Sequence, residues 1–420
     1  MGTERLYYSD SFLRRFQAQV TAVRQIPAGG GVDRYEVALD RTAFYPTSGG
    51  QPFDTGHLRV PRESGEWLNL AVDSVAEDEH GEIWHTLHQP LSPGAAVEGE
   101  IAWGRRLDHM QQHTGQHLLS ALFLSELQAP TLSFHLGPAT SNIDLACPSL
   151  TGEELEGVEL AANRIIAEDR PVTARAVPRP EAEALLAAGK LRKLPEREGA
   201  IRLIEIESCD LNACGGTHAR TTGQIGGLWL RATEKVSRGV RVHFVCGLRA
   251  VRAGRDDAAA LGQAMGALSV GAADLGAAIA RLQAEAKAAG KDRLRLREAL
   301  ARAEGVQMAA AAELNHGVRI VEAACAEHDR DYVRLLASRT ANAAPRTVAI
   351  LSSGEPQGAR VALARSRDLD FDCGAMMKQA LAERNLRGGG SSDLAQGELQ
   401  GSAAAELRAA LAARVRALLA

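Results

Sequence analysis

The segment His109-Met-Gln-Gln-His113-Thr-Gly-Gln-His117-Leu-Leu-Ser-Ala-Leu-Phe123 decides how the middle of the chain folds. Its apolar residues recur with a period of about 3.6 residues, which predicts a helix that starts near Asp108 and ends before Pro130. Residues four apart lie on one face of a helix. The imidazoles of His113 and His117 can therefore reach a single metal ion.

A second motif, Cys214-Gly-Gly-Thr-His218, follows a predicted strand and turn about a hundred residues later. A thiolate and an imidazole four residues apart are two further ligands of the types that zinc prefers. Either pair alone is weak evidence, since such histidines often lie on a partly buried helix face and Cys214 could be a small core residue. Together they predict a tetrahedral Zn²⁺ site with ligand distances of about 2.0–2.3 Å.

Two residues near these motifs have less specific spacing. Cys209 lies five residues before Cys214, and a turn or a strand end is its more common setting. His109 lies four residues before His113, and we expect it to support that ligand from outside.

Composition limits the remaining classes of protein. The 420 residues carry a formal net charge of −4, so any contact with nucleic acid must use local arginine clusters. No apolar run approaches the roughly 20 residues of a membrane helix, and the first residues lack a secretory pattern. Six cysteines in so long a chain make a disulfide framework improbable. We expect a cytoplasmic protein without membrane contact.

The predicted fold class is α+β multidomain. Residues 1–100 read as short strands between turns, typical of a small β-barrel or sandwich. Residues 101–254 mix strands with packed helices and hold the predicted zinc site. Residues 255–316 are rich in alanine, arginine and leucine with a heptad-like seam, which predicts a helical or coiled-coil-like linker. Residues 317–420 alternate strands and helices around a predicted glycine-rich loop.

The two metal motifs, HMQQHTGQHLLSALF and CDLNACGGTHARTTGQIG, resemble the editing domain of alanyl-tRNA synthetases. They resemble its free-standing relative, the AlaX family, more closely still. The likeness extends to LYYSDSFLRRFQAQV near the start and to FYPTSGGQPFDTG. In the last region, RGGGSSDLAQGEL is similar to the glycine-rich loop of the DHH-associated domain. These segments follow one another in the order expected for the long form of AlaX.

The resemblance implies a trans-editing hydrolase that uses Zn²⁺ held by His113, His117, Cys214 and His218. Its substrate would be tRNA(Ala) mischarged with serine or glycine. A pocket selected for alanine rejects an added hydroxyl poorly, whereas a second site that hydrogen-bonds this hydroxyl discriminates well. We expect no room for an aminoacylation domain before the barrel and find no loop suited to ATP, so synthesis is not the expected activity.

The resemblance also implies which residues surround the substrate. Gln116 corresponds to a pocket position, although it could equally solvate its helix, and Ser133 could equally cap a turn. Backbone amides at the double glycine are candidate oxyanion donors. The predicted pocket residues are Gln116, Ser133, His135, Gly215, Gly216 and Thr217, and the glycine motif beside them is Gly49, Gly50 and Gln51.

Basic residues after the zinc motif are candidates for tRNA contact, although any single arginine is more often a solvated surface residue. The predicted tRNA-binding residues are Lys235, Arg238, Arg241, Gly388, Gly389 and Gly390. The helical or C-terminal region could also form a homodimer.

Two other functions remain open at this stage. In the first, the protein binds tRNA without catalysis and zinc only stabilises the core. In the second, it is a phosphodiesterase of the DHH type, but Asp108-His109-Met110 breaks the required triplet and no acidic cluster replaces it.

Overall fold

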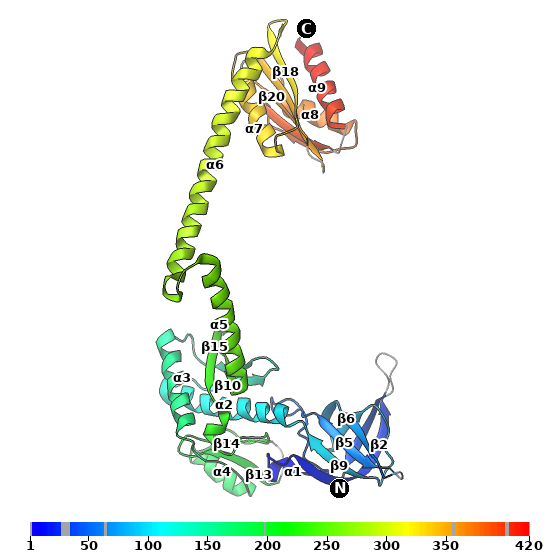
Figure 1. The fold of residues 1–420 in the computed structure, drawn as a ribbon, viewed down its shortest axis with the longest axis vertical. Helices are drawn as coiled ribbons and strands as arrows, with labels where there is room; N and C mark the ends of the chain where they lie inside the picture. The colour runs from blue at the N-terminus through cyan, green and yellow to red at the C-terminus, as the bar shows by residue number, and fades with distance from the viewer. Residues whose placement is uncertain are drawn as a thin grey trace. The chain divides into compact units, whose positions relative to one another are not determined.

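The computed structural model describes residues 2–26, 34–62, 65–196, 199–354, 358–399 and 403–419. They form two compact units, Met1–Gln263 and Ala264–Ala420, shown in Figure 1. Both units combine helices with sheets, so the predicted α+β class is confirmed. The finer division into four domains stays a prediction.

The first unit begins with a seven-stranded antiparallel sheet in the order β6-β5-β9-β2-β3-β8-β7. Alternation in β2 directs Phe16, Ala18 and Val20 into an apolar core. A short parallel pair, β1 (Glu4–Arg5) with β4 (Arg41–Thr42), and helix α1 (Leu6–Ser9) lie beside it. The strands are β2 (Arg15–Ile26), β3 (Arg34–Leu39), β5 (Gly56–Pro61), β6 (Trp67–Val72), β7 (Ser74–Glu77), β8 (Ile83–Leu87) and β9 (Ala96–Ile101).

The predicted barrel is instead a curled sheet. The first half of β2 pairs with β9 and the second half with β3, with a register shift between Val20 and Ala22. Strand β6 also contacts β8, although four strands separate them in the sheet order. Within the described residues, no pairing joins the edge strands β6 and β7, so hydrogen bonds do not close the sheet.

Helix α2 (Trp103–Leu127) confirms the helix predicted from the first motif, although it begins five residues before Asp108. It ends at Gln128, whose φ of 52° is left-handed, two residues before Pro130. The helix is buried on all sides from His109 to Phe123. Gly115 permits this, because a Cβ there would lie 2.4 Å from the sulfur of Cys246 on a neighbouring strand.

Two further sheets and two helices surround α2 in the first unit (Figure 1). Helix α3 (Gly152–Ala167) begins with a capping box between Thr151 and Glu154, and α4 (Arg179–Ala187) covers the smaller sheet. The four-stranded sheet is β10 (Thr131–Leu136), β11 (Ser141–Leu145), β16 (Gly239–Cys246) and β15 (Leu228–Val236). The three-stranded sheet is β12 (Val172–Val177), β13 (Ile201–Ile206) and β14 (Asp210–Ala213).

The predicted helical region consists of α5 (Leu248–Leu268) and α6 (Leu275–Ala311). Several residues of the heptad-like seam, including Ile279, Leu282 and Leu296, are exposed. Among the described helices, no single one is long and apolar enough to cross a membrane; α5 and α6 satisfy the length and composition only as a bent pair.

The second unit contains a six-stranded sheet in the order β17-β18-β19-β20-β22-β21. The predicted glycine-rich loop is wrong in form: Gly388–Gly390 is the edge strand β21 and pairs with β22. A Cβ on Gly390 would lie 2.2 Å from the carbonyl oxygen of Leu394, so the close pairing requires glycine. The elements are β17 (Leu314–Asn315), β18 (Val318–Cys325), α7 (Arg330–Ala341), β19 (Thr347–Ser353), β20 (Ala359–Arg365), α8 (Cys373–Ala382), β21, β22 (Leu394–Leu399) and α9 (Ala403–Leu419).

Candidate metal centre

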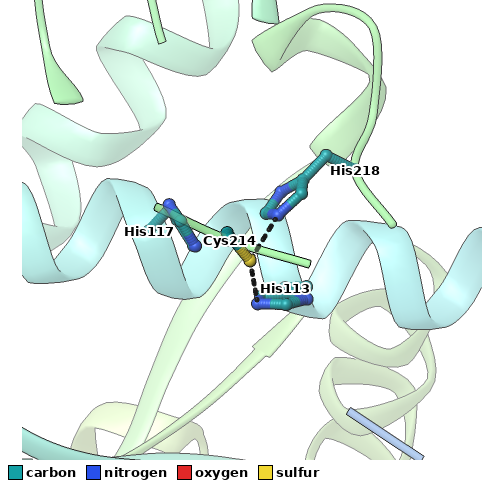
Figure 2. Close-up of side chains that lie close together, drawn as sticks. All are labelled: His113, His117, Cys214 and His218. Atoms are coloured by element: carbon teal, nitrogen blue, oxygen red, sulfur yellow. Dashed lines mark hydrogen bonds between the residues drawn. The ribbon is translucent and has the colours of Figure 1, made fainter. Parts of the chain in front are cut away.

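The side chains of the two metal motifs converge in the first unit, as Figure 2 shows. We call His113, His117, Cys214 and His218 the four-residue group. One ligand atom from each of them lies within 4.8 Å of all the others. Helix α2 supplies two of the histidines, and the loop after β14 supplies the cysteine and the third histidine.

The geometry of this group fits a tetrahedral zinc ion. Zinc–sulfur and zinc–nitrogen bonds of about 2.3 and 2.0–2.1 Å place two tetrahedral ligands about 3.5 Å apart. The sulfur of Cys214 lies 3.5 Å from Nε2 of His113 and 3.4 Å from Nε2 of His218. Three imidazoles and one thiolate are also a donor set that zinc prefers. The residues present therefore fit Zn²⁺.

Each histidine of the group is oriented by a hydrogen bond on its outer nitrogen. Such bonds fix the tautomer and direct Nε2 inwards, an arrangement common around protein-bound zinc. The outer pairs are His113 Nδ1 with Gln51 Oε1 at 2.9 Å, His117 Nδ1 with Asp210 Oδ2 at 3.0 Å, and His218 Nδ1 with Thr114 Oγ1 at 3.2 Å.

The glycine motif positions Gln51 for this contact. Gly49 and Gly50 occupy a two-residue turn with φ of 54° and 82°, a conformation that favours glycine at both positions. Gln51 is fully buried. Its Oε1 accepts the backbone N–H of Thr217 at 3.0 Å, and its Nε2 donates to the Thr217 hydroxyl at 2.8 Å. Gln51 thus joins the first ligand segment to the second.

Gly216 makes room for the group. A Cβ at this position would lie 2.1 Å from Cε1 of His113 and 2.9 Å from Oε1 of Gln51. Its backbone N–H donates to the sulfur of Cys214 at 3.3 Å. The N–H of Gly216 already has this partner, so the prediction that it serves as an oxyanion donor is not supported, whereas the same role for Gly215 stays a prediction.

The surrounding charges favour a thiolate. Burial alone would raise the pKa of the Cys214 thiol, but His113 and His218 lower it well below its usual value. The thiolate is the form that binds zinc. This site therefore stabilises the ligating form of its cysteine.

Asp210 controls the charge of the second histidine. Burial would lower the pKa of His117, but the hydrogen bond that its Nδ1–H donates to Asp210 and the nearby thiolate raise it to about 9. Asp210 also forms an ion pair with Arg192 and accepts hydrogen bonds from Asn212. This carboxylate is consequently held in place from several sides.

Replacing Asp210 by asparagine is expected to weaken zinc binding about 10- to 100-fold, the usual cost of losing such an outer partner. The asparagine keeps the shape but loses the charge that supports His117. A competition titration against a chelator measures the affinity. Asp144→Asn is the matched control, because Asp144 pairs with Arg241 rather than with the four-residue group. Equal affinities for both variants would contradict the role of Asp210.

Gln116 directly precedes His117 on α2, and half of its buried side-chain amide is unpaired. Its Nε2 donates to the hydroxyl of Ser120 at 2.7 Å, and Thr131 donates to the same oxygen at 2.7 Å. In the described part of the chain, its buried Oε1 has no hydrogen-bond partner. This oxygen can therefore accept a hydrogen bond from a ligand.

Two predicted pocket residues lie elsewhere. Strand alternation places Ser133 and His135 on an exposed face of β10, and Ser133 donates to Asp144 at 2.9 Å. The side chain that faces the four-residue group is Phe134, whose ring centroid lies 5.6 Å from that of His113. The prediction that Ser133 and His135 line the pocket is therefore not supported.

Three of the predicted tRNA-binding residues lie on one hairpin of the first unit. Lys235 and Arg238 are exposed at the end of the β15–β16 hairpin. Arg241 forms an ion pair with Asp144, with 2.7 Å between Nε and Oδ1. The glycines Gly388–Gly390 belong to the second unit.

Sequence reasoning missed several supporting residues. Asp210 lies four residues before Cys214, and Thr114 directly follows His113. Their closeness in sequence to the predicted ligands could have indicated a supporting role. The predicted support, His109, has a buried Nδ1 with no partner among the described residues. Gln51 supports His113 instead.

Comparison with known proteins shows that the chain is similar to enzymes that act on tRNA. Residues 201–241 match the family model of the threonyl and alanyl tRNA synthetase second additional domain. The chain is 33% identical to an alanine–tRNA ligase of Pyrobaculum neutrophilum over 95% of its own length. This alignment covers 43% of the ligase, so the chain spans less than half of that relative.

The chain is also similar to free-standing proteins that are shorter than this ligase. The alanyl-tRNA editing protein AlaX-M of Methanosarcina acetivorans is 34% identical, and the alignment covers 57% of this chain and 96% of that protein. AlaX-L of Pyrococcus horikoshii is also 34% identical, with 59% of each chain covered. The chain belongs to the AlaX family of alanyl-tRNA editing proteins.

Proposed function

We propose that this protein hydrolyses the ester that joins serine or glycine to mischarged tRNA(Ala). The observation that carries the proposal is the convergence of the four-residue group, together with the buried, half-paired amide of Gln116, the residue before His117. The names of the AlaX relatives support the same chemistry. The protein would act in the cytoplasm, since charged tRNA is used there.

Gln116 provides a physical basis for selecting serine. A buried polar atom without a partner costs about 1–3 kcal/mol, which a substrate hydroxyl can recover and a methyl group cannot. Serine therefore gains binding energy that alanine lacks. Glycine needs no hydroxyl contact and would rely on its small size.

The chain's residues would hold the substrate and the ion in a fixed arrangement. Zinc, when bound, acts as a Lewis acid that can fix the amino group or polarise the ester. Because four protein ligands close a zinc site, direct contact of zinc with the substrate requires that one ligand be released. We assign the four-residue group to positioning of the substrate. Water adds to the ester carbonyl, and cleavage of the C–O bond releases the amino acid and the 3′-terminal hydroxyl of the tRNA.

The test is deacylation of tRNA(Ala) charged with serine, glycine or alanine by the intact protein. The expected result is release of serine and glycine with alanyl-tRNA left intact. Equal turnover of alanyl-tRNA would contradict the proposed selectivity. Binding of all three tRNAs without hydrolysis would favour the alternative, a tRNA-binding protein with structural zinc.

Replacing Gln116 by alanine is expected to lower kcat/KM for Ser-tRNA(Ala) about 10- to 100-fold, the cost of one hydrogen bond in a buried site. Hydrolysis of Gly-tRNA(Ala) should change little, because glycine has no hydroxyl. Initial rates with both substrates give the comparison. Gln283→Ala, an exposed site on α6, is the control. An equal loss on both substrates would assign Gln116 a structural role.

A further inference from the structure

Four side chains of the first unit form a continuous row near the start of α2, in which two neighbouring rings are flanked by two guanidinium groups. The guanidinium of Arg220 lies 4.4 Å from the ring centroid of Phe12. The rings of Phe12 and Trp103 are 5.3 Å apart. The guanidinium of Arg14 lies 4.0 Å from the ring of Trp103. We call Arg220, Phe12, Trp103 and Arg14 the aromatic–arginine row.

One end of this row borders the metal centre. A cavity of about 180 Å³ is lined by Phe12 and Arg220 and also by the metal-ligand candidate His218. Arg202, which donates to the carbonyl oxygens of Cys214 and Gly216, lines the same cavity. The row therefore leads from the wall of a cavity at the candidate site to the start of α2.

The row also carries an excess of positive charge. Arg220 pairs with Asp10 at 3.1 Å and keeps 62% of its side chain exposed. Arg14 is exposed and has no carboxylate partner in the described part of the chain. Nearby, Arg105 lies over the ring of Phe53 and donates to the Phe53 carbonyl oxygen at 2.8 Å. An anionic occupant fits this surface.

Neighbouring rings flanked by guanidinium groups match the chemistry of unpaired RNA. Bases stack on aromatic side chains for about 1–3 kcal/mol each, and arginine both stacks on bases and binds phosphates. A polypeptide offers no comparable series of flat faces joined by anions. We infer that the aromatic–arginine row binds the single-stranded 3′ end of the tRNA and guides its terminal ester to the candidate metal centre. This inference rests on the proposed function for the identity of the RNA.

The test compares two uncharged RNA probes: an acceptor-stem minihelix of tRNA(Ala) with its unpaired 3′ nucleotides and the same duplex without them. Phe12→Leu/Trp103→Leu keeps apolar packing but removes both rings. Trp67→Leu is the control, because Trp67 also packs under an arginine, Arg59, but lies on the edge strand β6. Arg14→Gln, at an exposed position, tests the row without disturbing the core.

The double variant is expected to weaken binding of the tailed minihelix about 10- to 100-fold, the loss of one to two stacked bases. Binding of the blunt duplex and zinc content should match those of the wild type. Arg14→Gln should weaken binding of the tailed probe and reduce its salt dependence, because one phosphate contact is lost. The Trp67→Leu control should behave like the wild type.

An unchanged affinity for the tailed probe in both row variants would overturn the inference, as would an equal loss on both probes. These outcomes are separable from failure of the proposed function. If the wild type prefers the tailed probe through this row but deacylates nothing, the inference stands and the editing proposal fails. If the wild type deacylates Ser-tRNA(Ala) and both row variants bind and react normally, the editing proposal stands and the inference about the row fails.

Discussion

Replacing Cys214 by alanine is expected to abolish stoichiometric zinc binding and to reduce hydrolysis of Ser-tRNA(Ala) by more than about 100-fold. Loss of a residue that is hydrogen-bonded to a metal ligand typically lowers metal affinity or activity about 10- to 100-fold, and loss of the ligand itself should have a larger effect. Cys214 is the only sulfur in the four-residue group, and its sulfur lies within 3.5 Å of Nε2 of both His113 and His218. Metal analysis after exhaustive dialysis and initial deacylation rates measure the two effects.

Cys209→Ala is the matched control for this experiment. Cys209 lies five residues earlier and packs against the apolar core, and burial raises the pKa of its thiol to about 11. It should therefore keep full zinc content and activity. Circular dichroism shows whether each variant is folded. A folded Cys214→Ala protein that still hydrolyses Ser-tRNA(Ala) at the wild-type rate would show that hydrolysis does not depend on the metal centre.

Replacing Gly216 by alanine is expected to disable the site through shape alone. The added Cβ would lie 2.1 Å from a ring carbon of His113, so the imidazole or the loop must move. Overpacking of this kind costs about 1–3 kcal/mol of unfolding free energy. A displacement of about 1 Å at a catalytic group can cost about 100-fold in rate. Denaturant unfolding and deacylation assays check the two expectations.

Gly157→Ala provides the comparison, because Gly157 lies within helix α3 and its added Cβ would meet nothing within 4 Å. This variant should retain activity and gain a little stability, since alanine favours helix more than glycine does. Wild-type activity in Gly216→Ala would show that the loop tolerates the change and that the close packing on His113 has no functional role.

The helix and both ligand pairs could be predicted because their signals are local. Spacing of four residues defines a helix face, and Cys214 and His218 are close along the chain. Gln51 is different, since 62 residues separate it from His113 and only the fold brings them into contact. Asp210 reaches His117 across 93 residues in the same way. Supporting contacts of this kind depend on sheet topology, which no local pattern specifies.

The differences between these predictions and the structure have related causes. Motif position predicts Ser133 and His135 in the pocket, whereas the two-residue period of β10 directs Phe134 towards His113. The triple glycine suggested a loop from its composition, whereas close pairing with β22 makes it a strand. The spacing of the first strands and turns predicts a small barrel or sandwich, whereas closure of a barrel depends on pairing between the two edge strands. In each case long-range packing overrode a local preference.

The central claim is that two distant segments close on one zinc ion through three nitrogens and one sulfur. X-ray absorption at the zinc edge of the purified protein tests this most directly. The account predicts one zinc per chain with one sulfur at about 2.3 Å and three nitrogens at about 2.0–2.1 Å. A zinc shell without sulfur, or a protein that binds no zinc when Cys214 is reduced and accessible, would contradict it.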